Sequence, residues 1–148
     1  MISRADALRH VLERVAPLSP VEVEVASAAG LVLAEDVTAS RPVPPFANTA
    51  MDGIAVRAAD THHGAVLRLV GTVAAGDSGA IEVGRGQAVR IMTGAPVPPG
   101  ADAVVMVELC TFEGSGADET VTVASDVPVG NHIRPVGDDI AAGSVVLS

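Results

Sequence analysis

The sequence predicts an α+β protein that is mainly β, with one N-terminal helix and several short twisted strands. Apolar residues recur at helical spacing near the N-terminus, and strand-like runs bounded by glycine and proline turns follow at fairly regular intervals. Apolar residues make up 49% of the chain, yet its aromatic residues are two phenylalanines. A core of valine, alanine, leucine and isoleucine favours β-structure with small-residue packing.

The predicted helix covers residues 4–15. Its apolar stripe has the spacing i, i+3, i+4 and i+7 and consists of Leu8, Val11, Leu12 and Val15. Ser3 followed by Asp6 resembles a capping box, with aspartate in place of the usual glutamate or glutamine. Pro17 ends the pattern. We therefore expect an amphipathic helix.

Seven runs are expected to form strands. They cover residues 21–25, 31–37, 65–73, 87–92, 103–109, 119–124 and 144–148. The run 103–109 is the most apolar and is expected to lie at the centre of a sheet. In the run 21–25, Glu22 and Glu24 alternate with valines, which favours a solvated strand face over an acid–base pair.

Charge and cysteine content exclude several classes of function. The formal net charge is −9, there is no lysine, and the arginines are spread singly, so neither a nucleic acid nor an anionic membrane is an expected partner. The single cysteine, Cys110, excludes an internal disulfide and fits a reducing compartment. The N-terminus does not resemble a signal peptide, and no apolar run reaches membrane-spanning length. We expect a soluble, cytoplasmic protein.

The stretch Pro42–Val56 joins two halves of different character. Its prolines predict an extended passage over residues 41–45, and Gly53 opens an apolar run. Asn48, Thr49 and Asp52 lie between these two parts. The stretch is either a buried corner whose polar side chains satisfy the local backbone, or part of a polar site.

Isolated polar groups in glycine- or proline-rich turns are the candidates for such a site: Asp52, Thr93, Arg134, Asp138 and Asp139. Carboxylate and hydroxyl oxygens suit Mg²⁺, and an arginine suits a phosphate or another oxyanion. Sequence spacing does not prove that these groups converge. No sequence motif pairs a nucleophile with a general base, and the sequence contains no fingerprint of a dinucleotide-binding or P-loop site.

Three stretches together resemble the N-terminal part of the molybdopterin molybdenumtransferase family, which includes the bacterial MoeA proteins and the gephyrin E domain. They are PPFANTAMDGIAV at residues 44–56, RIMTGAPVP at 90–98 with GADAVV at 100–105, and NHIR at 131–134 with GDDI at 137–140. Their order and spacing fit the family, and the similarity runs across nearly all 148 residues.

The resemblance implies a transferase of molybdenum cofactor biosynthesis, which inserts molybdenum from molybdate into adenylylated molybdopterin in a Mg²⁺-assisted step. The matching site residues are Asp52, Thr93, Arg134 and Asp139, with Asp52 as a possible Mg²⁺ ligand. Molybdopterin and molybdate would be the substrates, and Mg²⁺ the cofactor.

The resemblance also implies a homodimer built from two small subdomains, one inserted in the other. Residues 1–45 with 132–148 would form a discontinuous subdomain, and residues 46–131 the inserted β-rich one. The family's pterin-binding domain is expected beyond these residues, so we expect this chain to be inactive alone and to act as part of a longer enzyme. The alternative is a dimerisation or scaffolding module without catalysis; a small-molecule carrier is a third option that no motif supports.

The chain departs from the family pattern at four positions. Ala47 replaces an aspartate, Thr49 a serine, Ile54 a tyrosine, and Pro135 an arginine. A carboxylate, a phenol and a cation are thereby lost, so we expect weaker or altered oxyanion binding near these turns.

Overall fold

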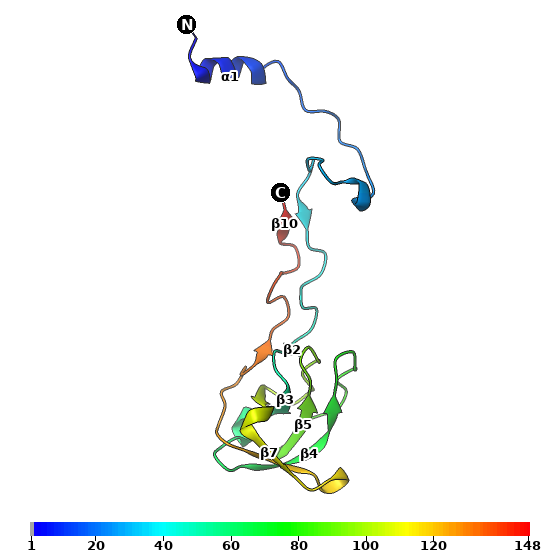
Figure 1. The fold of residues 1–148 in the computed structure, drawn as a ribbon, viewed down its shortest axis with the longest axis vertical. Helices are drawn as coiled ribbons and strands as arrows, with labels where there is room; N and C mark the ends of the chain where they lie inside the picture. The colour runs from blue at the N-terminus through cyan, green and yellow to red at the C-terminus, as the bar shows by residue number, and fades with distance from the viewer. Residues whose placement is uncertain (1) are drawn as a thin grey trace. The chain divides into compact units, whose positions relative to one another are not determined.

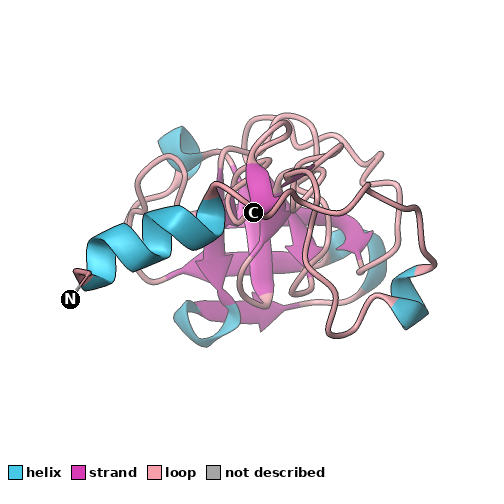
Figure 2. Cartoon of the chain, turned by 90° about the horizontal axis from the view of Figure 1, so that it is seen from above, coloured by secondary structure: helices cyan, strands magenta, loops and turns pink. Residues whose placement is uncertain are grey.

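The computed structural model describes residues 2–148 and divides the chain into two compact units. The first unit runs to Asp36 and includes Ser148, and the second comprises Val37–Leu147 (Figure 1). Apart from the helix α1 (Arg4–Leu12), helical residues form only short single turns, and the rest is strand and loop (Figure 2). Within residues 2–148 no helix is long and apolar enough to cross a membrane.

The helix α1 confirms the predicted N-terminal cap. The Ser3 hydroxyl oxygen accepts a hydrogen bond from the Asp6 amide at 3.1 Å and donates one to the Asp6 carboxylate at 2.6 Å. The helix ends at Leu12, three residues earlier than predicted, and none of its residues is buried. Its apolar stripe is therefore exposed rather than packed against a core.

Two predicted strands in this first unit are wrong. Residues 21–25 form no strand and lead instead into the 3-10 turn η1 (Val25–Ser27). Of residues 31–37, only Val37 belongs to a strand. Alternation provides an apolar face, but a strand also needs a hydrogen-bonded neighbour, and residues 21–36 have none within the described chain.

The second unit begins and ends in an antiparallel ladder, in which residues 37–49 run beside residues 133–147 (Figure 1). The paired strands are β1 (Val37–Thr38) with β10 (Val145–Leu147), and β2 (Asn48–Thr49) with β9 (Ile133–Arg134). An isolated bridge joins Val43 to Ile140 between these pairs, within the passage predicted to be extended.

A six-stranded sheet fills the middle of the second unit, in the order β6-β3-β5-β4-β8-β7. Its strands are β3 (Gly53–Val56), β4 (Val66–Val73), β5 (Gln87–Ile91), β6 (Ala103–Met106), β7 (Cys110–Glu113) and β8 (Thr120–Val123). Neighbouring strands are antiparallel, except that β4 and β5 are parallel, with a register shift between Leu69 and Thr72. Three 3-10 turns lie along this part of the chain: η2 (Ala58–Asp60), η3 (Val107–Leu109) and η4 (Gly116–Asp118).

The sheet is curled and packs aliphatic side chains on both faces, as the composition predicted. Ile54 and Val56 of β3 belong to one buried cluster, which also contains Leu67, Val105 and Val121. Ala55, between them, belongs to a second cluster with Val73, Val83, Val89, Ile91 and Val104. Because successive side chains of a strand point to opposite faces, this alternation buries both faces of β3.

The run 103–109 is not the central strand that its apolar sequence predicts. The strand β6 ends at Met106, and it lies at one edge of the sheet. Its residues are apolar because both faces are buried, and Asn131 covers its open edge. The Asn131 carbonyl accepts from the Val104 amide at 2.9 Å, and the Asn131 side chain donates to the Val104 carbonyl at 2.7 Å.

The predicted strands at 65–73, 87–92, 119–124 and 144–148 are confirmed, each shortened at one or both ends.

Gly53 sits where β3 passes closest to β6, which yields a first prediction. A Cβ atom there would lie 1.9 Å from the Val105 carbonyl oxygen, so Gly53→Ala requires the backbone to move. We expect this substitution to lower the free energy of unfolding by about 3 kcal/mol in urea titrations. The matched control is Gly71→Ala, whose Cβ would meet only the flexible end of the Ile81 side chain, at 2.7 Å. Equal losses in the two variants would contradict the packing described here.

Candidate functional site

Thr49 organises the corner that leads to the candidate site. Its side chain is 1% exposed, and its hydroxyl donates to the Met51 carbonyl at 2.7 Å and accepts from the Met51 amide at 3.2 Å. Its amide donates to the Ala95 carbonyl at 3.1 Å, and its carbonyl accepts from the Gly94 amide at 2.9 Å. The interpretation of this stretch as a corner with locally satisfied polar groups is therefore right for Thr49.

Asp52 and Thr93, which are 41 residues apart in sequence, are in direct contact. The Asp52 Oδ1 atom accepts hydrogen bonds from the Thr93 amide at 2.7 Å and from the Thr93 hydroxyl at 2.5 Å. Both residues are exposed. Gly94, with a φ of 80°, makes the turn that aims the Thr93 amide and hydroxyl at one oxygen. The Asp52 Oδ2 atom has no hydrogen-bond partner in residues 2–148.

These two hydrogen bonds lower the pKa of the Asp52 carboxyl from its ordinary value of 3.8. The Thr93 hydroxyl is the larger cause and the Thr93 amide the second, and both act by stabilising the charged form. Asp52 is therefore a fixed, exposed carboxylate at neutral pH. It can accept hydrogen bonds or face a cation through its free oxygen.

Arg134 forms the second pair of the site with the acidic residues that follow it. Its Nη2 atom lies 2.5 Å from Asp139 Oδ1, and its Nε atom lies 3.3 Å from Asp138 Oδ2. These contacts raise the pKa of the Arg134 guanidinium, with the hydrogen bond to Asp139 as the largest cause. Two carboxylates thus offset the charge of the guanidinium, while its Nη1 atom has no hydrogen-bond partner in residues 2–148.

The strand β2 connects the two pairs. On one side its Asn48 pairs with Arg134, and on the other Asn48 forms a bridge to Pro96, in the loop that carries Thr93. The structure thus brings Asp52 into contact with Thr93 and Arg134 into contact with Asp139. The segments that carry Thr93 and Arg134 are both paired with β2. No hydrogen bond or ion pair joins one pair to the other among the described residues.

The described residues do not fit a resident magnesium site. Within residues 2–148, no three histidine, cysteine, aspartate or glutamate side chains are grouped so that they can hold a metal ion. Asp52 provides one free carboxylate oxygen, and the Thr93 hydroxyl, which donates to Asp52, could add only its own oxygen as a further ligand. Mg²⁺ is commonly bound through one or two carboxylates together with substrate phosphates, so the predicted Mg²⁺ would need ligands other than these.

The departures from the family motif fall in different environments. Ile54 is fully buried in the core, so the tyrosine that it replaces is not a missing group on the exposed surface beside Asp52. Pro135 is exposed directly after Arg134, whereas Ala47 is half-buried, and its carbonyl accepts from the Val97 amide at 3.0 Å. Only Pro135 therefore changes the exposed polar groups next to a candidate residue.

Within residues 2–148, the Cys110 thiol has no side-chain hydrogen-bond partner that could act as its base. Its thiol donates to the Met106 carbonyl at 3.3 Å, and burial raises its pKa to about 11, with the Arg90 guanidinium opposing this and Glu108 adding to it. The thiol is protonated at neutral pH, which is unfavourable for a nucleophile.

His132 belongs to the NHIR motif, but no sequence pattern assigns it a role. This residue has a φ of 52°, rare for a residue other than glycine, and its carbonyl accepts from the Ala50 amide at 3.0 Å. It thereby ties the turn before β9 to the segment that leads to Asp52. The neighbouring Gly130 and Asn131 signal a turn, but sequence alone does not show which segment that turn contacts.

Fold and site together define a mainly β protein with one helix and a curled sheet, whose turns present ordered charged side chains. The model of a family described as "MoeA N-terminal region (domain I and II)" matches residues 2–148. The chain belongs to this family.

Relatives and solved structures agree with this assignment. Molybdopterin molybdenumtransferase 2 of Mycobacterium tuberculosis is 40% identical over 144 residues, which cover 94% of this chain and 35% of the relative. Molybdopterin molybdenumtransferase of Haemophilus influenzae is 38% identical over 149 residues, which cover 99% of this chain and 36% of the relative. The crystal structure of the molybdopterin biosynthesis moeA protein from Pyrococcus horikoshii OT3 matches with a TM-score of 0.86 and 35% identity, covering 97% of this chain and 38% of that one. The chain thus spans little more than a third of the length of these proteins.

The Asp52–Thr93 contact predicts how the Asp52 carboxyl titrates. Thr93→Val removes the hydroxyl and keeps the amide, so we expect the pKa of Asp52 to rise towards 3.8; Thr93→Ser, which keeps both donors, should leave it low. Carbon-13 NMR of the aspartate carboxyls between pH 2 and 6 measures this. An unchanged Asp52 pKa in Thr93→Val would show that the hydroxyl does not stabilise the carboxylate.

The same contact gives a direction to the pH dependence of stability. The folded-state pKa of Asp52 is lowered, so its carboxylate adds to the free energy of unfolding above the unfolded-state pKa. This stabilisation is lost as the pH falls through the folded-state pKa. The difference in stability between wild type and Thr93→Val should therefore shrink on acidification below about pH 4.

Proposed function

We propose that this chain is part of a molybdopterin molybdenumtransferase and helps to insert molybdenum from molybdate into adenylylated molybdopterin. Its relatives, which are molybdopterin molybdenumtransferases, support the transferase class of this reaction. The chain would contribute Asp52, Thr93, Arg134 and Asp139 to the transfer site. A pterin-binding domain outside these residues would complete it, so residues 1–148 alone would be inactive.

The observation that carries this proposal is the preformed Asp52–Thr93 pair. A carboxylate held by two hydrogen bonds does not need to reorganise when a substrate arrives. Its free Oδ2 atom can accept a proton or a hydrogen bond from the substrate, or can face a Mg²⁺ ion that the substrate brings. Arg134, held by Asp138 and Asp139 through Nε and Nη2, would orient an oxyanion through its Nη1 atom, which neither carboxylate contacts.

We further propose that residues 1–45 with 132–148 form one subdomain and that residues 46–131 are inserted in it. The pairing of β1 with β10 and the bridge between Val43 and Ile140 support this division, because they join the chain segments on either side of the insertion. The site residues lie near this junction, since Asn48 pairs with Arg134 there.

A dimerisation or scaffolding module is the second candidate. The exposed apolar stripe of α1 favours it, because Leu8, Val11 and Leu12 are each more than half exposed, at 56%, 58% and 63%. A homodimer of the whole protein is compatible with both candidates. They differ in whether Asp52 is needed for chemistry.

Asp52→Asn in the whole protein that carries these residues separates the two candidates. The amide keeps the side chain's shape but loses its charge, so we expect molybdenum incorporation into molybdopterin to fall about a hundredfold or more. The melting temperature should fall only slightly, because Asp52 is exposed, and the sedimentation coefficient should stay unchanged. The matched control is Asp126→Asn, an exposed aspartate away from the site, and it should retain wild-type activity. Full activity in Asp52→Asn would reject the catalytic role and leave the scaffolding role.

A further inference from the structure

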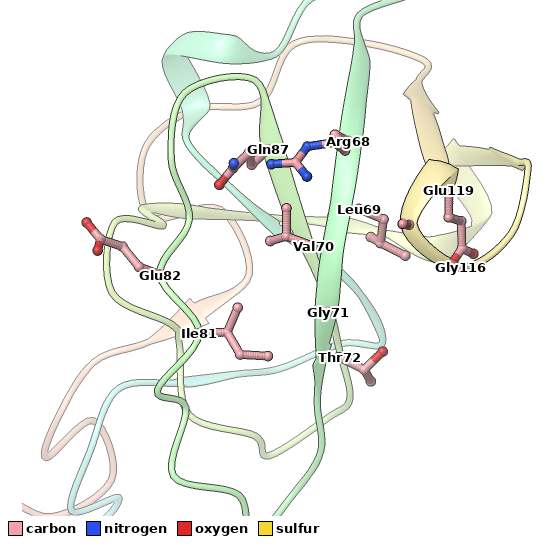
Figure 3. Close-up of a pocket in the computed structure, with 11 residues that line it drawn as sticks. Arg68, Leu69, Val70, Gly71, Thr72, Ile81, Glu82, Gln87, Gly116 and Glu119 are labelled. Atoms are coloured by element: carbon pink, nitrogen blue, oxygen red, sulfur yellow. The ribbon is translucent and has the colours of Figure 1, made fainter.

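A pocket of about 480 Å³ lies on the sheet, and none of the four candidate site residues lines it. It is formed by the strand β4, by the loop that leads into β5, and by the turn η4 (Figure 3). Its lining residues are Arg68, Leu69, Val70, Gly71, Thr72, Ile81, Glu82, Gln87, Gly116, Ala117 and Glu119. This volume is within the range of small-molecule sites.

Arg68 provides a cation that no carboxylate of residues 2–148 pairs with. It lies on β4, and its backbone pairs with Gln87 on one side and with Thr120 on the other. Its side chain is exposed and forms no ion pair or hydrogen bond with another side chain of residues 2–148. Arg90 and Arg134, by contrast, are each held by carboxylates.

Gln87 places a second donor beside Arg68. Its Oε1 atom accepts from the Gly84 amide at 3.0 Å, which leaves the side-chain NH₂ group to face the pocket as a donor. Figure 3 shows the Arg68 guanidinium and the Gln87 amide next to each other, as their paired positions on β4 and β5 require. Two adjacent donor groups without an acceptor suit a negatively charged oxygen.

The two glutamates of the pocket do not cancel this preference. The Glu119 carboxylate lies 3.0 Å from Arg90 Nη2, and the Arg90 guanidinium also stacks over the Phe112 ring, 4.0 Å from its centroid. The Glu82 carboxylate points away from Arg68 and Gln87 (Figure 3). The Arg68 guanidinium is thus available to a ligand, whereas Glu119 is paired with Arg90 and Glu82 points away from the two donors.

The remaining lining residues provide an apolar surface and room. Val70 and Ile81 are partly buried and pack against the second core cluster, which holds them in place. Gly71, Gly116 and Ala117 carry little or no side chain, so this part of the pocket stays open. An apolar chain of a few carbons can lie on Val70 and Ile81.

We propose that this pocket binds a small molecule with an oxyanion, a carboxylate or a phosphate, attached to a short apolar body. The oxyanion contacts the Arg68 guanidinium and the Gln87 amide, and the apolar body packs on Val70 and Ile81. The pocket is a second site, separate from Asp52 and independent of the proposed transferase activity.

NMR titrations of the protein with sodium acetate, sodium hexanoate and inorganic phosphate, at constant ionic strength, test the proposal. We expect shifts of the Arg68 Nε–H and Gln87 Nε2–H resonances, with hexanoate binding about tenfold more tightly than acetate because of its longer apolar chain. Phosphate distinguishes the two kinds of oxyanion: binding as tight as that of acetate assigns a site for any oxyanion, and no binding restricts it to carboxylates. Equal binding of hexanoate and acetate would overturn the apolar contact. The absence of shifts at Arg68 and Gln87 with every probe would overturn the site.

Two substitutions test the two donors. Arg68→Gln removes the cation, and Gln87→Glu keeps an oxygen for the Gly84 amide while replacing the donor with an anion. Each should weaken hexanoate binding about tenfold or more. The matched control is Arg85→Gln, which removes the charge of another exposed arginine that does not line this pocket, and it should change binding less than about twofold. Equal weakening in Arg85→Gln and Arg68→Gln would show a general charge effect and overturn the site.

Discussion

The backbone of Thr49 is the constraint on which the candidate site depends. This residue is hydrogen-bonded to the loop at Gly94 and Ala95 and pairs with Ile133 of β9, so it joins three distant segments of the chain. Because buried backbone groups need partners, losing one of these pairings would expose Thr49 and free its neighbours. Asp52 meets Thr93 and lies near the Arg134 turn because this strand is held on both sides.

A rigid support explains why the charged groups of the site can be exposed and still be ordered. Surface ion pairs contribute little to stability by themselves, so neither Asp52 nor Arg134 is needed to hold the sheet together. The fold is instead stabilised by the aliphatic clusters around β3 and β5, with Gly53 allowing β3 to lie against β6. This division of roles leaves the polar side chains available for binding or chemistry.

Sequence patterns predicted those parts of the fold whose cause is local. Ser3 and Asp6 identified the helix cap, and the runs 65–73 and 87–92 identified strands with buried faces. Sequence patterns failed where a distant partner decides whether a segment forms a strand or where that strand lies in the sheet. Residues 21–25 alternate without a neighbour to pair with, and the run 103–109 is apolar at an edge that Asn131 covers. The four candidate residues came from their place in glycine- and proline-rich turns and from the resemblance to a family, whereas the contact of Asp52 with Thr93 required the structure. His132 lies in the NHIR motif, but its contact with Ala50 also required the structure, and the Arg68–Gln87 pair has no sequence signature.

We propose that the Asp52–Thr93 and Arg134–Asp139 pairs act as one site across β2. A double-mutant cycle of Asp52→Asn and Arg134→Gln, measured as molybdenum incorporation by the whole protein, distinguishes one shared site from two independent ones. If both pairs serve the same step, the double variant should lose little more activity than the more damaged single variant. Losses that multiply across the two substitutions would contradict a single site and would separate Arg134 from the chemistry of Asp52.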